Sequence, residues 1–307
     1  MVAKIFIDGE AGTTGLEIRE RLLPRKDLAL LSIAADKRKD EGAKKDLLAQ
    51  ADLVILCLPD DAAKQSVALV DSLGADAPRV LDASTAHRIA PGWVYGFAEM
   101  AAGQAGAIHA ASKVANPGCY ATGAIALLRP LVDAGLILAA TPLTINAVSG
   151  YSGGGKSMIE AYEARQAPDF ELYALGLEHK HLPEIVTYSK LDRRPIFVPS
   201  VADFRQGMLV SIPLHLDDLP HRPKASDLQA VLKAHYAQST FVKTLDVDSS
   251  GKLEPQALNG SNNLELRVYG NEARRHAVLV ARLDNLGKGA SGAAVQNLEL
   301  MLGLQQG

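Results

Sequence analysis

The stretch "KIFIDGEAGTTGLEIRERLL" (residues 4–23) joins an apolar strand to a helix through a turn rich in glycine. Glycine lets the chain turn tightly and approach a phosphate closely, and the following helix directs free N–H groups and its positive dipole end at the anion. The spacing G-x-x-G-x-x-G departs from the usual G-x-G-x-x-G, so the position after the first strand carries the prediction of a nucleotide site. The candidate contacts are Gly9, Gly12, Thr13, Thr14 and Gly15.

The rest of the first half continues to alternate strands and helices. Apolar strands are predicted at residues 28–35, 52–60 and 79–84, with helical patterns between them. Near-continuous apolar strands separated by helices are typical of a parallel sheet that is covered on both faces. The first half is therefore predicted to be an α/β, Rossmann-type domain with a parallel sheet.

The residues after the second strand bear on the kind of nucleotide. Asp36 lies about twenty residues beyond Gly15, where an acid would hold a ribose hydroxyl and favour NAD. Lys37, Arg38 and Lys39 follow at once, and three cations suit a 2′-phosphate. A solvated basic loop is the alternative, since most runs of charge are solvated. We predict NADP as the cofactor, with the three basic residues as contacts.

The sequence pattern changes near residue 140. Strand-like segments become frequent and helices fewer, with one clear helix at 226–238 and a closing helix at about 289–304. Mixed or antiparallel sheets produce this pattern. The second half is therefore predicted to be an α+β substrate domain with a mixed or antiparallel sheet.

Composition excludes several classes of protein. The chain of 307 residues has a net charge of −3, and its acidic and basic residues are mixed, so we expect no nucleic-acid partner. No apolar run reaches the roughly 20 residues of a membrane helix, and the N-terminus lacks the pattern of a signal peptide. Two cysteines make no disulfide framework. We expect a cytoplasmic protein that does not bind membranes.

One of the two cysteines has an unusual position. Cys119 follows Asn-Pro-Gly at the predicted start of a helix, whereas Cys57 lies inside an apolar strand and is expected to be a core residue. A free thiol with a pKa of about 8.5 is only slightly ionised at neutral pH, and a helix N-terminus stabilises the thiolate. Cys119 is therefore a candidate nucleophile, with a buried structural cysteine as the alternative.

A candidate base for this thiol lies in "LEHKHLPEI" (residues 177–185). His179 and His181 are two residues apart, so they share one face if the segment is extended, and Pro183 argues against a helix that continues across it. Glu184 could orient one imidazole or bind substrate. The spacing from the thiol to the histidines fits no common metal-ligand pattern, so no metal is predicted. The other histidines are expected to be surface or packing residues.

Four segments occur in one order: the glycine turn, N-P-G-C-Y, H-K-H-L-P-E about sixty residues later, and "DNLGKGASGAAVQN" (residues 284–297). This set resembles the shorter form of the N-acetyl-γ-glutamyl-phosphate reductase family of arginine biosynthesis. That family shares its architecture with aspartate-semialdehyde dehydrogenase and, more remotely, with glyceraldehyde-3-phosphate dehydrogenase. The resemblance covers the whole chain, and N-P-G-C-Y and D-N-L-x-K-G are its specific motifs.

The resemblance implies a domain organisation and a cofactor. A Rossmann-type NADP-binding domain would be built from residues 1–118 with 286–307, and residues 119–285 would form an inserted catalytic, substrate and oligomerisation domain. NADPH would donate hydride, and Asn285 and Gly289 would lie near its nicotinamide. The partners would be a small acyl phosphate substrate and further copies of the chain, in a dimer or tetramer.

The resemblance also implies roles for the thiol and its neighbours. Cys119 would be the nucleophile that expels phosphate and holds the acyl group as a thioester, which hydride from NADPH then reduces. His181 would be the acid and base, with His179 as the less favoured candidate. Glu184 would support the histidine or the substrate. The activity implied is reduction of N-acetyl-γ-glutamyl phosphate to N-acetylglutamate 5-semialdehyde.

Two further segments resemble family motifs that lie near the substrate. "DASTAHR" (82–88) resembles D-x-S-x-x-x-R, which would bring Ser84 and Arg88 to the substrate phosphate; a surface arginine is the alternative. "SGYSGGGK" (149–156) resembles the glycine loop near the active site, which makes Lys156 a substrate-binding candidate. A flexible surface loop is the alternative for that lysine.

Two alternative functions remain open. Aspartate-semialdehyde dehydrogenase would use the same cofactor and thiol for a shorter substrate with a free amine, and the H-x-H-x-P-E segment favours the acetylglutamyl enzyme over it. A redox sensor would bind NADP without turnover, and it would need neither a phosphate-binding arginine nor paired histidines. Consumption of NADPH with an acyl phosphate distinguishes an enzyme from such a sensor.

Overall fold

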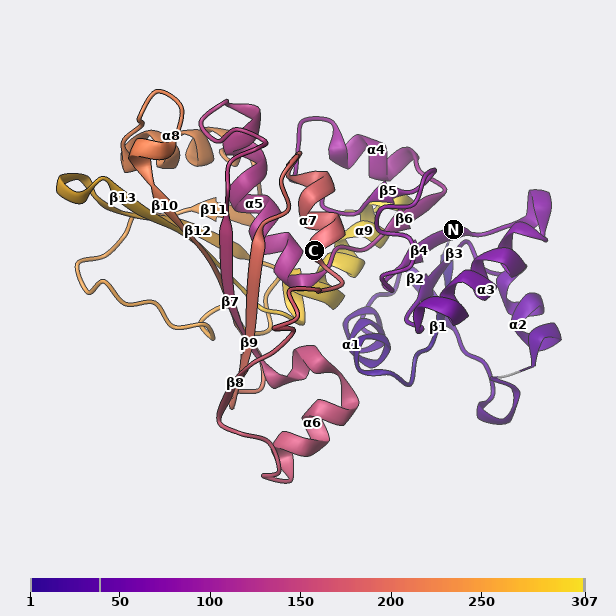
Figure 1. Cartoon of the computed structure of the whole chain (residues 1–307). Helices are drawn as coiled ribbons and strands as arrows, with labels where there is room; N and C mark the ends of the chain where they lie inside the picture. The colour runs from indigo at the N-terminus through magenta and orange to yellow at the C-terminus, as the bar shows by residue number, and fades with distance from the viewer. Residues whose placement is uncertain (1, 39, 306–307) are drawn as a thin grey trace. The chain divides into compact units, whose positions relative to one another are not determined.

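The computed structural model describes residues 2–38 and 40–305, and the chain divides into two compact units (Figure 1). The first unit contains Met1–Ala98, Gly103–Pro117 and Ala290–Gly307, and the second contains Glu99–Ala102 and Gly118–Gly289. In the described ranges, no helix is long and apolar enough to cross a membrane.

The first unit is built on a six-stranded sheet in the order β2-β1-β3-β4-β6-β5. Its strands are β1 (Ala3–Asp8), β2 (Leu28–Leu31), β3 (Leu53–Leu56), β4 (Arg79–Asp82), β5 (Val94–Tyr95) and β6 (Lys113–Ala115). Every pairing in it is parallel, which confirms the predicted Rossmann-type sheet. Because β1 lies between β2 and β3, the strand order reverses there, and ligands of such sheets bind outside the carboxyl ends at that point.

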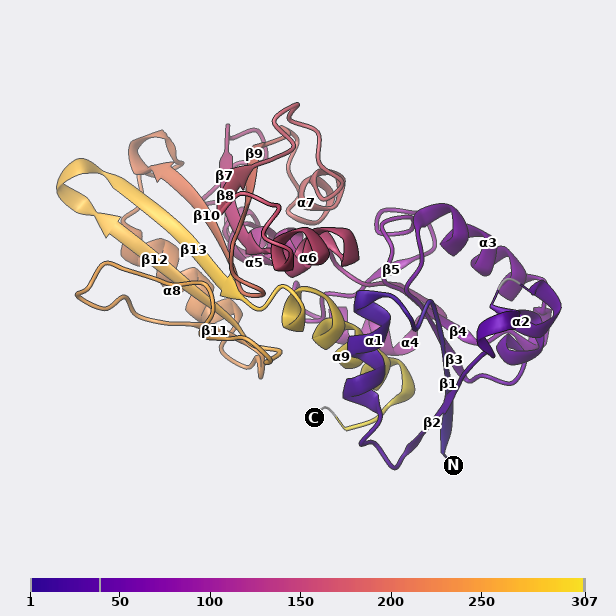
Figure 2. The same ribbon diagram turned by 90° about the horizontal axis from the view of Figure 1, so that it is seen from below.

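Helices cover both faces of this sheet (Figure 2). One face carries α1 (Thr13–Leu22), α4 (Gln104–Ala110) and α9 (Gly292–Leu302), and the other carries α2 (Glu41–Leu48) and α3 (Asp60–Asp71). Successive side chains of a strand point to opposite faces. Accordingly, Ile5 and Ile7 belong to the cluster that contains Leu298 of α9, and Phe6 to the cluster that contains Val67 of α3. The buried strands are therefore apolar on both sides.

The second unit contains a seven-stranded sheet in the order β11-β12-β13-β10-β7-β9-β8. Its strands are β7 (Thr144–Gly150), β8 (Phe170–Leu172), β9 (Ile196–Ala202), β10 (Met208–His215), β11 (Val242–Thr244), β12 (Leu264–Asn271) and β13 (His276–Leu283). The pairs β11–β12 and β7–β9 are parallel and the others antiparallel. The predicted mixed sheet is thus confirmed.

One face of the mixed sheet packs against helices. The helices of this unit are α5 (Cys119–Asp133), α6 (Lys156–Glu163), α7 (Leu182–Tyr188) and α8 (Ala225–His235). Helix α5 packs on β10 and β13, and α7 and α8 pack on α5. The short 3₁₀ turns of the chain are Ala35–Lys37, Gly74–Asp76, Tyr151–Gly154, Leu216–Asp218 and Glu272–Arg274, and Gly287–Ser291 is a π-helical turn. Helix α5, almost fully buried, forms the centre of this unit.

The opposite face of the mixed sheet is also apolar. It forms a hollow of about 650 Å³ whose lining includes Val148, Leu209, Val278 and Val280. Leu253, from the segment between β11 and β12, also lines it. An antiparallel sheet that faces water usually alternates apolar and polar residues, so this face has the composition of a surface that becomes covered.

Candidate active site

The thiol of Cys119 lies at the start of the central helix of the second unit. Cys119 is the first residue of α5, as the sequence predicted, and Gly118 before it is extended. Thr122 forms the first hydrogen-bonded turn of this helix: its N–H and its hydroxyl both donate to the carbonyl of Gly118, at 2.8 and 3.0 Å. Residues at this position lie at the positive end of the helix dipole, which favours a negatively charged sulfur.

Glu184 connects the backbone beside this thiol to a histidine. Its Oε2 accepts a hydrogen bond of 3.0 Å from the N–H of Gly118, and its Oε1 lies 4.0 Å from Nε2 of His181. Both side chains are buried, with Glu184 1 % and His181 4 % exposed. Glu184 lies three residues after His181, in the first turn of α7, so this helix sets both side chains at once. A buried carboxylate beside an imidazole stabilises its protonated form.

His179 occupies a different environment. Its ring lies among Tyr120, Tyr173 and Phe197, with centroid distances of 5.8, 5.8 and 5.1 Å. Its Nδ1 accepts the N–H of His181 at 3.1 Å. This hydrogen bond ties the ring of His179 to the backbone two residues later in the chain. His179 therefore packs in an aromatic box and fixes the backbone of His181.

The segment that carries the two histidines is not extended at His181, so the condition under which both would share one face is not met. His181 has helical backbone angles (φ −87°, ψ −12°) and immediately precedes α7. The two imidazole rings are 4.7 Å apart and steeply inclined, at 77°. Pro183 lies in the first turn of α7, where a missing N–H costs nothing. Proline therefore marks the beginning of a helix here and not only the interruption of one.

Two tyrosines complete the surroundings of the histidines. The hydroxyl of Tyr120 donates to the carbonyl of Ser200 at 3.0 Å and accepts from the hydroxyl of Tyr173 at 3.1 Å. Burial raises the pKa of both phenols, so they remain neutral donors. Sequence reasoning missed both residues. Tyr120 could have been found because it follows Cys119 in the N-P-G-C-Y motif, whereas nothing in the sequence distinguishes Tyr173.

Cys57 differs from Cys119 as predicted. It packs against an apolar cluster that includes Ile55 and Leu81. Burial, with smaller contributions from Asp82 and Asp8, raises the pKa of its thiol to about 12. Cys57 is therefore a half-buried packing residue whose thiol is protonated at neutral pH.

The glycine turn lies between β1 and α1 as predicted. Gly9 has φ of +92°, and a methyl group added there would lie 2.3 Å from the carbonyl oxygen of Cys57. The N–H of Gly12 donates to the carbonyl of Gly9 at 3.0 Å, which closes the turn directly before α1. Thr13 and Thr14 are the first residues of α1 and Gly15 is buried behind them. These residues therefore form the backbone cradle that a phosphate needs.

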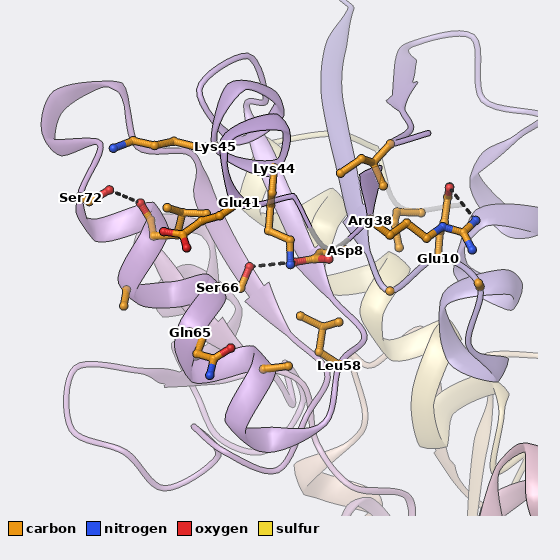
Figure 3. Close-up of a pocket in the computed structure, with 17 residues that line it drawn as sticks. Asp8, Glu10, Arg38, Glu41, Lys44, Lys45, Leu58, Gln65, Ser66 and Ser72 are labelled. Atoms are coloured by element: carbon orange, nitrogen blue, oxygen red, sulfur yellow. Dashed lines mark hydrogen bonds and ion pairs between the residues drawn. The ribbon is translucent and has the colours of Figure 1, made fainter. Parts of the chain in front are cut away.

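A cleft of about 990 Å³ opens beside this turn, at the carboxyl ends of β1 and β3 (Figure 3). Its size and its position at the reversal of strand order fit a dinucleotide. Arg38 lines it and points toward Glu10, at 3.9 Å. Lys44 of α2 lies 2.9 Å from the carboxylate of Asp8 on the cleft floor.

The structure sorts the basic residues predicted to contact the cofactor. Asp36 and Lys37 are exposed and do not line the cleft, and Lys39 lies outside the described residues. Lys44 and Lys45 of α2 do line it, and sequence reasoning missed them. Their signal was the lysine pair in the charged segment, but only the packing of α2 beside β1 shows which lysines face the cleft.

The segment after β4 holds the two residues predicted near the substrate phosphate. Asp82 accepts the N–H and the hydroxyl of Ser84, at 2.9 and 2.7 Å, and lies 2.6 Å from Nδ1 of His87. Arg88 is buried, and its Nε donates to the carbonyl of Asn116 at 3.1 Å. The alternative of a surface arginine is therefore wrong. The hydroxyl proton of Ser84 is already directed at Asp82, so this serine holds the turn in place.

Comparison with known proteins agrees with this geometry. Residues 119–285 match the family model for the dimerisation domain of semialdehyde dehydrogenases. The chain is 54 % identical to the N-acetyl-gamma-glutamyl-phosphate reductase of Chelativorans sp. over 98 % of its length and 99 % of that protein's. It is 52 % identical to the Brucella ovis protein of the same name, over 99 % and 100 %. The chain belongs to the N-acetyl-gamma-glutamyl-phosphate reductase family. It is therefore an oxidoreductase that uses NAD or NADP.

Solved structures share the fold of this reductase. Aspartate semialdehyde dehydrogenase II of Vibrio cholerae, complexed with ASA, superposes with a TM-score of 0.71 at 15 % identity, over 98 % of each chain. The Candida albicans aspartate semialdehyde dehydrogenase with NADP gives 0.67 at 14 % identity, over 98 % of the reductase and 99 % of that chain. At these identities the likeness shows the fold alone.

The remaining predicted residues of the reductase lie in the second unit. Lys156 is exposed at the start of α6, 3.7 Å from Glu160. Asn285 is buried; its Oδ1 accepts the N–H of Gly207 at 2.8 Å and its Nδ2 donates to the hydroxyl of Ser152 at 2.9 Å. This asparagine therefore holds the glycine loop. Gly289 lies against the side chain of Cys119.

Proposed function

We propose that the chain reduces N-acetyl-γ-glutamyl phosphate to N-acetylglutamate 5-semialdehyde and phosphate, with NADPH as the hydride donor. The observation that carries the proposal is the connection from Cys119 through Gly118 to the buried pair of Glu184 and His181. It supplies a nucleophile, a base and a group that stabilises the charged base. The names of the curated relatives favour this substrate over aspartate semialdehyde, and favour an enzyme over a redox sensor.

The chemistry assigned to these residues is acyl transfer to sulfur followed by reduction. Sγ of Cys119 attacks the acyl carbon as its proton passes to His181; the C–S bond forms, the bond to the phosphate oxygen breaks, and phosphate leaves with the electron pair. Because Nε2 of His181 faces Glu184, we assign proton exchange to Nδ1. Bound NADPH supplies the hydride. The hydride adds to the thioester carbonyl carbon; collapse of the resulting tetrahedral alkoxide breaks the C–S bond, releases the aldehyde and returns the thiolate of Cys119, which then regains its proton from His181.

The cofactor proposal rests on the cleft in the first unit. Its glycine turn suits the pyrophosphate. Three basic residues, Arg38, Lys44 and Lys45, line the cleft together with three acidic ones, Asp8, Glu10 and Glu41. Lys44 is paired with Asp8 at 2.9 Å, whereas Arg38 lies 3.9 Å from Glu10, so the proposal of NADP rests on Arg38 as the contact for a 2′-phosphate. The proposed contacts are Gly9, Gly12, Thr13, Thr14, Gly15 and Arg38; Lys37, Lys39, Asn285 and Gly289 stay predictions.

The proposed substrate contacts are Arg88, Glu184, Ser84 and Lys156. Arg88 is the best supported of them for the phosphate, because a buried guanidinium with one donor on Asn116 is already oriented. Ser84 would influence the substrate through the turn that it stabilises by its hydrogen bond to Asp82. Lys156 is supported only by its position at the end of the glycine loop.

We also propose a homo-oligomer assembled through the second unit. The apolar hollow on the open face of the mixed sheet and the match to a dimerisation domain support a dimer or a tetramer. The functional domains proposed are residues 1–118 with 286–307 for cofactor and 119–285 for catalysis and assembly. A cytoplasmic location stays a prediction.

One assay tests the proposed function. The purified chain is given phosphate, NADP⁺ and either N-acetylglutamate semialdehyde or aspartate semialdehyde, and NADPH formation is followed. We expect phosphate-dependent turnover with the acetylated aldehyde, and its loss in Cys119→Ser with NADPH binding retained. Preference for aspartate semialdehyde would transfer the assignment to the related dehydrogenase, and binding without turnover would support a sensor.

A further inference from the structure

The π-helical turn Gly287–Ser291, between β13 and α9, packs against the side chain of the nucleophile Cys119. A methyl group added to Gly289 would lie 2.8 Å from Cβ of Cys119 and 3.1 Å from the carbonyl oxygen of Asp284. A side chain at this position would therefore require a shift of either the turn or the start of α5. Single π-helical turns are rare and occur mostly at functional sites. The position of this turn thus limits the position of the Cys119 side chain.

A buried ion pair anchors the turn at its second residue. Lys288 is 1 % exposed, and its Nζ lies 2.9 Å from both carboxylate oxygens of Glu99. The ammonium also lies 5.2 Å from the centroid of the Phe241 ring. Burial lowers the pKa of Lys288, and Glu99 opposes that shift. Because the ammonium contacts both oxygens of the carboxylate and is shielded from water, the pair keeps one geometry.

Stability alone does not explain this pair. Apolar residues of similar volume at the sites of a buried ion pair often give equal or greater stability, because two charges must be desolvated. What an ion pair adds is a directional restraint, since its hydrogen bonds fix the orientation of both side chains. Gly287 and Gly289 flank Lys288; Gly287 packs closely against the carbonyl of Ser261, and the N–H of Gly289 donates to the carbonyl of Asp284 at 2.9 Å. The ion pair of Lys288 holds the residue between these two contacts.

We propose that Lys288 is a positioning residue for Cys119. Through its ion pair with Glu99 it fixes the turn, and through Gly289 the turn confines the thiol to the orientation from which sulfur attacks. The inference rests on the proposed function insofar as Cys119 is the nucleophile. It assigns a task to the lysine of the D-N-L-x-K-G motif, which has no role in the chemical steps proposed above.

The test separates position from stability. Lys288→Met with Glu99→Leu replaces the pair by apolar residues, and Glu99→Asp keeps the charge but withdraws it by one methylene. Lys288→Arg restores the charge with another shape. Lys233→Met is the matched control, because Lys233 forms an exposed pair with Asp246, at 2.6 Å, in the same unit.

Three quantities are measured for each variant: the melting temperature, kcat and KM, and the rate at which iodoacetamide alkylates Cys119 at a pH where that thiol is fully ionised. We expect the double variant to melt near the parent. Its kcat should fall roughly 10- to 100-fold, because a displacement of about 1 Å can have that effect, with little change in KM. Alkylation of Cys119 should become faster, because the turn that packs against it is less firmly held. Alkylation of Cys57 should stay slow, which shows that the fold is intact.

Glu99→Asp should also lower kcat and speed the alkylation of Cys119, both to a smaller degree than the double variant. Lys288→Arg should keep a higher kcat than the double variant. The control, Lys233→Met, should change neither kcat nor alkylation. Parental kcat and alkylation in a stable double variant would overturn the proposal. If the double variant does not fold, parental values in Glu99→Asp overturn it instead. Alkylation needs no substrate, so the positioning of Cys119 is tested even if the acyl phosphate proves to be a different one.

Discussion

The carboxylate of Glu184 accepts the backbone N–H of Gly118 at 3.0 Å, one residue before the nucleophile, and turns its other oxygen toward His181. One buried side chain thereby fixes the start of α5 and the neighbouring imidazole. Glu184→Gln keeps the size and an acceptor but removes the charge that stabilises protonated His181. We expect kcat to fall and the thermal stability to change little.

Glu184→Ala should behave differently, because it leaves the N–H of Gly118 buried without an acceptor, at a cost of about 1–3 kcal/mol. Both kcat and the melting temperature should fall. Glu178→Gln is the control, since Glu178 forms an exposed pair with Arg194. Equal stability loss in the Gln and Ala variants would contradict the assigned hydrogen bond.

The two histidines should respond differently to substitution. His181→Asn removes the group that takes the thiol proton, so thioester formation should slow by roughly 10²- to 10⁴-fold. His179→Phe keeps the aromatic box and should lower stability more than the chemical step. Rapid quench of acyl-enzyme formation measures the first quantity and thermal unfolding the second. A crippled His179→Phe beside a mild His181→Asn would mean that His179 is the base.

Cofactor choice should depend on the basic residues that line the cleft. Arg38→Ala should weaken NADPH binding by about 1.5–3 kcal/mol, the range for a charge-assisted contact, and leave NADH binding nearly unchanged. Lys26→Ala is the matched control, because Lys26 is exposed in the same unit and does not line the cleft. Fluorescence titration with both nucleotides measures the four affinities. Equal losses for NADPH and NADH would argue against a 2′-phosphate contact.

Arg88 should not tolerate lysine. The Nε contact to Asn116 orients the guanidinium, and lysine can reproduce neither that contact nor a two-pronged grip on phosphate. We expect Arg88→Lys to raise KM for inorganic phosphate in the reverse reaction, with NADP⁺ binding unchanged. An unaltered phosphate dependence would remove Arg88 from the substrate site and leave it a structural role.

The buried thiol of Cys57 should make the fold sensitive to alkali. Burial raises its pKa to about 12, whereas the unfolded value is about 8.5, so the unfolded state loses its proton first. The free energy of unfolding is therefore unaffected by this group below about pH 8.5 and decreases between about pH 8.5 and 12. Urea titrations across that window should show a smaller decrease for Cys57→Ala than for the parent. Parallel curves would show that the thiol does not contribute.

Local features of this chain were predictable and long-range ones were not. The turn before Thr13 and the start of α5 at Cys119 depend on nearby glycine and proline, so the sequence alone located them. Pro183 correctly argued against a helix that continues across it, but proline is compatible both with a break and with a first turn, so the sequence did not show that α7 begins there. The exposed position of Lys37 depends on how the chain leaves β2, and no periodicity reports that.

The pairing of Lys288 with Glu99 shows why the rest escaped prediction. These residues are 189 positions apart, and each by itself resembles an ordinary charged residue. Only the packing of α5 and its neighbours brings them together and excludes water. The same holds for Tyr173, whose contact with Tyr120 spans 53 positions.

The hydrogen bond from the N–H of His181 to Nδ1 of His179 has a consequence for redesign of the site. The acceptor is a side chain two residues earlier in the chain, so a change at position 179 also changes how the backbone presents His181. A side chain that fills the aromatic box but has no acceptor removes this hydrogen bond. An engineered variant that replaces His179 must therefore supply another acceptor at that position if the imidazole of His181 is to keep its place.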